Sequence, residues 1–171
     1  MTPIFLQDAL VEELQDLFQD FRSQAPDGTR RPLNVFAQYL PKREHSIDQR
    51  VTQGRPGPAQ KRPADPRFPY ICVDLTSGEI PEGRNADHTI STVLVIGTYH
   101  NGCDRQGARD VFNIIDRIYD RYSRMPVMGK KYVLKFPIRW YLQEDEPYEY
   151  FFGGMELDWL VPAIRREIPY T

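Results

Sequence analysis

Residues 41–69 constrain this chain most, because they combine prolines with positive charge. The six prolines of the segment are Pro41, Pro56, Pro58, Pro63, Pro66 and Pro69. Each fixes its own backbone and lacks a hydrogen-bond donor, so no regular helix or strand can run through the segment. Only Ile47 and Val51 add larger aliphatic side chains between Ile47 and Pro66, which is too little to offset the entropy of ordering. We therefore expect one domain spanning 1–171 with an extended basic loop at 41–69.

Charge is distributed unevenly along the chain. Between Arg30 and Arg67 nine cations face three acidic residues, a local net charge of +6, although the whole chain sums to −2. The remainder must carry about −8. A uniformly cationic protein that coats nucleic acid is excluded, and an acidic domain with a basic arm is indicated.

Hydrophobic periodicity outside the loop predicts an α+β fold. Apolar residues recur every three to four positions in two segments, which indicates helices. They alternate in four others, and the segment 89–99 is apolar on both faces in its middle, which indicates five strands, 89–99 being central in the sheet. We expect a mostly antiparallel β-sheet with two helices on one face, in the order α-β-β-β-α-β-β. The predicted helices are 3–22 and 105–124, and the predicted strands are 33–40, 70–76, 89–99, 132–142 and 150–161.

Particular residues refine this expectation. Phe112 falls on the predicted buried stripe of the second helix, and Asp104 is placed to cap that helix. Trp140 alternates with the inward residues of 132–142 and is expected in the core, as is Trp159. Pro137 indicates that its strand lies at an edge or carries a bulge. Gly153 and Gly154 indicate a bulge or a close approach of the backbone. Ser77-Gly78 is expected to turn the chain.

No arrangement of residues indicates chemistry. His88 and His100 lie at opposite ends of one predicted strand, too far apart to bind one metal ion. Cys103 could meet His100, but no third group is evident that would orient this histidine as a base. Gly97, Gly102 and Gly107 match no phosphate-binding spacing. No stretch approaches the roughly 18 apolar residues of a membrane span. We expect neither enzymatic activity nor a cofactor, a metal or a membrane partner.

Contacts between subunits are the remaining use for the charged segments. The basic loop and an acidic turn beside aromatic residues are complementary, so a head-to-tail contact between copies of the chain could close a ring. Two solvated loops would explain the same charges. The interface candidates are Lys42, Arg43, Arg50, Arg55, Lys61, Arg62 and Arg67 of the loop, Glu144, Asp145 and Glu146 of the turn, and Tyr148, Tyr150 and Phe151 beside it.

Three stretches resemble the tail terminator family of long-tailed bacteriophages and prophages. They are FPYICVDLTSGE from Phe68, HTISTVLVIGTYHNGCDRQGARDVFNIIDRI from His88, and FPIRWYLQEDEPYEYFFGGMELDWLVP from Phe136. The resemblance implies a small α+β subunit whose homo-oligomeric ring, expected to be a hexamer, caps the tail tube and joins it to the head connector. The implied partners are the chain itself, the tail tube protein and the head–tail connector or stopper protein. The implied location is the head-proximal end of the virion tail, after assembly in the bacterial cytoplasm.

Two other functions stay open at this point. Neck and tail completion components have similar sizes and folds, so the chain could occupy another position in the particle. A nucleic-acid-binding accessory protein could use the basic loop, with binding that falls steeply as salt rises. In that case Arg55, Lys61, Arg62 and Arg67 would contact phosphates. The tail terminator interpretation, in contrast, expects no direct contact with DNA.

Overall fold

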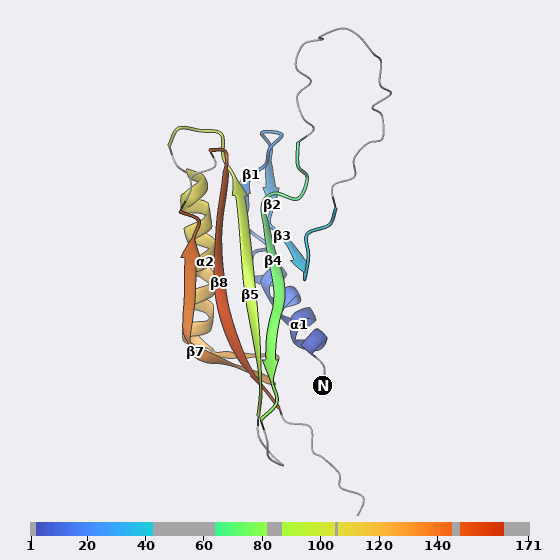
Figure 1. Cartoon of the computed structure of the whole chain (residues 1–171). Coiled ribbons are helices and arrows are strands. Elements are labelled where there is room, and N and C mark those ends of the chain that lie inside the picture. Colours follow the sequence, from blue (N-terminus) through green and yellow to red (C-terminus); the bar gives the residue numbers. More distant parts are fainter. Residues whose placement is uncertain (1–2, 43–63, 82–86, 105, 145–147, 163–171) are drawn as a thin grey trace, which may run out of the picture.

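The computed structural model describes residues 3–42, 64–81, 87–104, 106–144 and 148–162 (Figure 1). Two helices and eight strands lie within these ranges. In chain order they are α1 (Pro3–Leu17), β1 (Arg22–Gln24), β2 (Arg30–Pro32), β3 (Asn34–Ala37), β4 (Tyr70–Glu79), β5 (His88–Tyr99), α2 (Gln106–Arg124), β6 (Val127–Met128), β7 (Tyr132–Leu142) and β8 (Tyr150–Val161).

The fold is α+β, built on one curled mixed sheet with the strand order β3-β4-β5-β8-β7-β6. Strands β3 and β4 run parallel, and the other described pairs of this sheet are antiparallel. Strands β1 and β2 form a separate antiparallel hairpin. The expected helices and the five expected strands are all present. The described sheet is mostly antiparallel, as expected, and the parallel pair β3–β4 makes it mixed.

Several details of the expected order were wrong. Strands β1, β2 and β6 are additional, and each is two or three residues long without apolar alternation. Helix α1 ends at Leu17 instead of continuing to residue 22. Strand β4 continues through Ser77 and Gly78 to Glu79, with a register shift between Leu75 and Ser77 in place of the predicted turn. Pairing with the long strand β5 keeps this polar segment extended.

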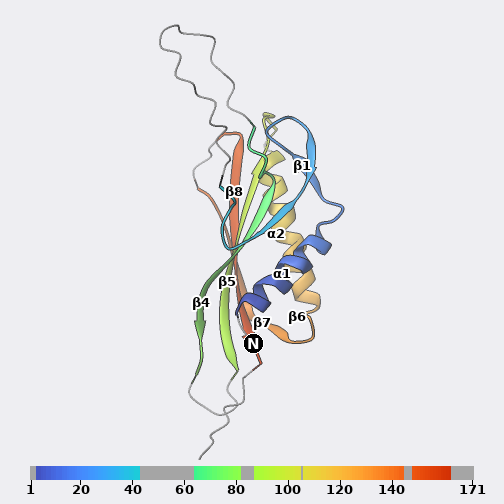
Figure 2. The same ribbon diagram turned by 90° about the vertical axis from the view of Figure 1, so that its right-hand side faces the viewer.

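Both helices pack on the same face of the sheet (Figure 2). Their apolar stripes meet buried residues of β4, β5 and β8, and Trp159 is completely buried among them, as the sequence predicted. The Trp159 ring packs edge-on against Tyr122 of α2, and its Nε1 donates a hydrogen bond to Thr92 Oγ1 at 3.1 Å. We call the side of the sheet on which α1 and α2 pack the covered face, and the opposite side the open face.

Strand β7 lies at the margin of the sheet, as Pro137 predicted. Its register with β8 shifts between Lys135 and Arg139, and beyond it lies only the two-residue strand β6. The expected burial of Trp140 and Phe112 was wrong, because this margin extends past the packed part of α2. Trp140 is 51% exposed, and its ring meets the half-exposed Phe112 ring edge-on at 5.7 Å.

The paired glycines of β8 mark close approaches of the chain, and the register shows no bulge beside them. A Cβ on Gly153 would lie 2.7 Å from Val111 Cγ1 of α2, and one on Gly154 would lie 2.4 Å from the Tyr141 ring. Adjacent strand residues point to opposite faces, so Val111 and Tyr141 mark the covered and open faces respectively.

Candidate subunit interface

The structure separates the predicted interface residues into three groups. Arg43, Arg50, Arg55, Lys61, Arg62, Asp145 and Glu146 lie outside the described residues. Lys42, Glu144 and Tyr148 are exposed. Arg67, Tyr150 and Phe151 are partly buried and contact the subunit's own interior.

Arg67 is held inside the subunit. Its Nη2 lies 2.7 Å from Oδ2 of the buried Asp65, its Nε donates to Asp65 Oδ1, and its Nη1 donates to the Pro41 carbonyl at 3.3 Å. The hydrogen bond to Asp65 raises the pKa of the Arg67 guanidinium. Arg67 therefore joins Pro41 to Asp65 and is a poor candidate for a residue that contacts a partner.

Tyr150 belongs to an aromatic cluster at one end of the open face. Its ring contacts Phe68 at 5.0 Å and Tyr99 at 5.2 Å, and Phe68 also contacts Tyr70. Phe68, Tyr70 and Tyr99 are buried although both described helices lie on the other face, and burial raises the pKa of Tyr70 to about 12. Phe151 points the other way, against Gly107 of α2.

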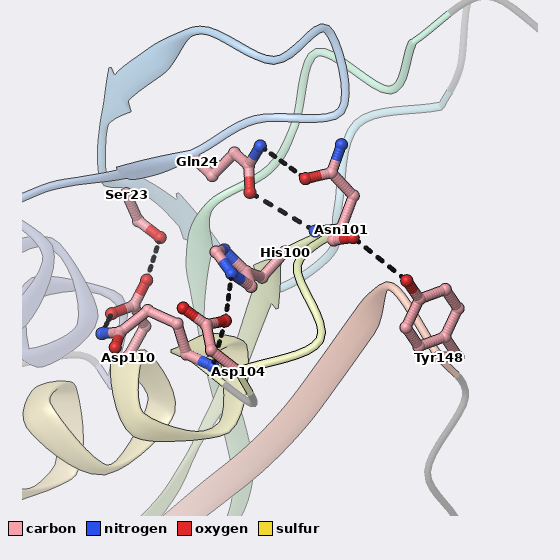
Figure 3. A network of polar contacts seen from close by, with 8 residues as sticks. Ser23, Gln24, His100, Asn101, Asp104, Asp110 and Tyr148 are labelled. Carbon is pink, nitrogen blue, oxygen red and sulfur yellow. Dashed lines mark hydrogen bonds and ion pairs between the residues drawn. The ribbon is translucent and has the colours of Figure 1, made fainter.

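Tyr148 takes part in a polar network that holds the turn between β5 and α2 (Figure 3). Its hydroxyl donates to the Asn101 carbonyl at 3.0 Å. The Gln24 side chain of β1 exchanges two hydrogen bonds with Asn101. Asp104 accepts from the Gln106 amide, as expected of a cap, and this bond, with a contact to His100 at 2.7 Å, holds the Asp104 pKa below its ordinary value.

The same network contains Ser, His and Asp residues, but their pairing does not suit catalysis. Ser23 Oγ donates to Asp110 Oδ2 at 2.5 Å, whereas His100 pairs with Asp104. A serine nucleophile needs a base within hydrogen-bond reach, and here the hydroxyl meets a carboxylate that Gln106 also contacts. His88 and His100 lie at opposite ends of β5, as expected. Within the described ranges, no group of three potential metal ligands occurs.

Away from the aromatic cluster, the open face keeps a strip of β7 accessible. Register with β8 places Val133, Lys135, Arg139 and Tyr141 opposite Leu160, Asp158, Glu156 and Gly154, and directly opposed residues share a face. The buried residues of β8 alternate with these, so the β7 residues point to the open face. All four are exposed. We call them the β7 strip.

Helix α1 presents a second accessible surface on the other side of the molecule. Ile4, Phe5, Asp8, Glu12 and Asp16 are exposed and follow one side of the helix. Ile4 and Phe5 are each 59% exposed. We call these five residues the α1 row. Sequence reasoning missed it, although residues 1–21 contain five carboxylates and neither lysine nor arginine.

Neither a family model nor a curated protein matches the chain. Among the described residues, no helix is both long enough and apolar enough to cross a bilayer.

Proposed function

We propose that the protein is a structural virion component, a phage tail terminator whose homo-oligomeric ring caps the tail tube and joins it to the head connector. The observation that carries the proposal is the layer structure. Both helices cover one face of the sheet, and the opposite face and the β7 margin stay accessible with apolar and charged side chains on them. A subunit that assembles side by side needs such faces.

The sequence pattern supports the same function. The three stretches that resemble tail terminators supply β4, the unit from β5 to α2, and the unit from β7 to β8, which together contain most of the sheet. The fold proposed is accordingly the tail-terminator-like one, in a ring of six copies.

Mass measurement of the native protein tests the proposal. A six-membered ring of the 20.0 kDa chain has a mass of about 120 kDa, and its population should rise with protein concentration. Adding isolated phage tail tubes should place rings at one tube end in electron micrographs. A protein that stays monomeric at high concentration, and leaves tubes bare, would overturn the proposal.

Binding to nucleic acid is the competing outcome. If the loop contacts phosphates, binding at low salt should be lost in R55A/K61A/R62A. Arg67 is kept in this variant because its contacts with Asp65 and Pro41 are structural. Salt-sensitive binding that disappears in the triple variant, without ring formation, would favour the accessory protein.

A further inference from the structure

The β7 strip combines apolar surface with positive charge. Tyr141 is 46% exposed, and the outer end of its ring lies over Gly154, so part of the ring is available to a partner. Lys135 makes no ion pair within the described part of the chain. Its neighbour in register, Asp158, accepts a hydrogen bond from Ser91 of β5 at 2.6 Å. Arg139 lies 3.8 Å from Glu156 in an exposed pair, which costs little to rearrange.

The sequence around the strip is basic. From Arg121 to Arg139 the chain has six cations and no carboxylate. A partner surface suited to the strip therefore combines apolar groups with carboxylates.

The α1 row has this composition. Ile4 and Phe5 supply apolar surface at the start of the helix, and the carboxylates of Asp8, Glu12 and Asp16 follow at intervals of four residues, about 6 Å apart. None of these three makes an ion pair with another described residue. The remaining carboxylates of residues 1–21 behave differently, because Glu13 pairs with Arg121 and Asp20 pairs with Arg117.

The two surfaces lie on opposite sides of one subunit. Helix α1 contacts β3, β4 and β6 on the covered face, whereas the strip belongs to the open face of β7 (Figures 1 and 2). The sheet separates them, so one copy cannot bring its own row to its own strip. Unlike surfaces that match only between copies produce head-to-tail contacts, which close into a ring when the rotation between neighbouring copies allows it.

We propose that the α1 row of one copy packs on the β7 strip of the next. The inference rests on the proposed ring and assigns the contact between its subunits. Carboxylates of the row meet Lys135 and Arg139, and Ile4 or Phe5 packs on Tyr141 or Val133. The contact adds a helix to the open face, so the sheet gains helices on both sides, one of them from its neighbour.

Charge reversal tests this contact. K135E/R139E and D8K/E12K each place like charges across it, so each should associate at least about tenfold more weakly than wild type. R30E/R109E is the matched control for K135E/R139E, because it makes the same change in net charge at exposed cations outside both surfaces and outside the predicted interface residues. Sedimentation at low salt gives the association constants, and circular dichroism shows whether each variant is folded.

Rescue separates a lost contact from a damaged fold. Mixing the two variants should restore rings of alternating subunits, because each reversed strip then meets a reversed row. Combining all four substitutions in one chain should also restore association. A misfolded variant would be rescued in neither experiment.

The outcomes distinguish the inference from the function beneath it. If wild type forms rings and both reversed variants form them equally well, the contact lies elsewhere and the inference fails. Weakening by the control to the same extent, or failure of both rescues with folded variants, also overturns it. If wild type neither assembles nor binds tail tubes, the proposed function itself fails.

Discussion

The two faces of the sheet solve the problem of burial differently. The covered face is closed by α1 and α2, and its large side chains, from Leu6 to Trp159, are fully buried. Among the described residues, the open face is closed at one end, where the segment with Asp65 and Phe68 and the ring of Tyr150 cover Tyr70 and Tyr99. Burial at this end thus depends on the short segment from Asp65 to Phe68, which we call the clasp. The β7 strip beyond it stays accessible.

The comparison separates residues that stabilise the subunit from residues that are available for contacts between subunits. Substitutions on the covered face should reduce the stability of the subunit. Substitutions on the accessible part of the open face should leave its stability nearly unchanged and alter association. The predictions below test that division.

The two cysteines should show the largest difference. Cys72 lies in the closed end of the open face, and burial there raises its pKa to about 12, whereas Cys103 is exposed. At pH 8 only about one Cys72 in ten thousand is a thiolate, the reactive form. A maleimide should therefore label one thiol in the native protein and two after unfolding, as counted by mass spectrometry. Rapid labelling of both thiols in the native state would show that the clasp does not close this end.

The two tryptophans compare the covered face with the sheet margin. Trp159→Ala removes a buried ring and the hydrogen bond to Thr92, so it should lower the free energy of unfolding by about 3–5 kcal/mol. Trp140→Ala should lower it by about 1 kcal/mol or less, because half of that side chain is already in water. Urea unfolding of both variants gives the two values. Equal losses would contradict the division between the packed layer and the margin of the sheet.

Adjacent glycines of β8 compare the faces at one point. Gly153→Ala should cost about 1–3 kcal/mol, since the added methyl group meets Val111 and the Tyr141 carbonyl inside the packed layer. Gly154→Ala meets only the outer end of the exposed Tyr141 ring, which can swing away. We expect a stability change within about 0.5 kcal/mol for that variant. Association of this variant should weaken, because the added methyl group displaces the Tyr141 ring from its place over Gly154. Denaturant curves measure the stability and sedimentation measures the association.

The sequence specified the long elements because their apolar periodicity is carried by many residues. Helix α2 and strands β5, β7 and β8 begin and end within one residue of the prediction. The short strands β1, β2 and β6 are held by pairing with a neighbour, and two or three residues are too few to show a periodic pattern. Trp140 alternates with the core residues of β7 and is nevertheless exposed. How far the helices cover β7 depends on tertiary packing, which the pattern of a single strand does not contain.

The candidate interface was harder to predict for the same reason. Excess carboxylates at the N-terminus and excess cations near β7 are both visible in the sequence. Their placement on opposite faces follows only from the order of strands in the sheet. In the sequence, Arg67 does not differ from the other cations of the loop, and its ion pair with Asp65 is seen only in the structure. Most of the other loop cations lie outside the described residues, so their predicted role stays a prediction.

The smallest effect concerns a charge at the rim of the covered face. Glu13 of α1 lies 2.6 Å from Arg121 of α2, beside a hollow of about 570 Å³ that Met128 and Gly129 also line. Burial raises the pKa of Glu13 above its ordinary value of 4.5, and Arg121 opposes that shift without cancelling it.

Titration of Glu13 should therefore leave a signature in stability. The folded protein holds the Glu13 proton more tightly than the unfolded chain does, so ionisation costs stability as pH rises from about 4.5 through the folded pKa. Gln cannot titrate, so the free energy of unfolding of wild type minus that of Glu13→Gln should fall across this window and level off above it. The fall should be larger in an Arg121→Gln background, where the opposing charge is gone. A difference that rises with pH would mean that the ion pair outweighs burial, and that the rim of the covered face is as open to water as the β7 strip.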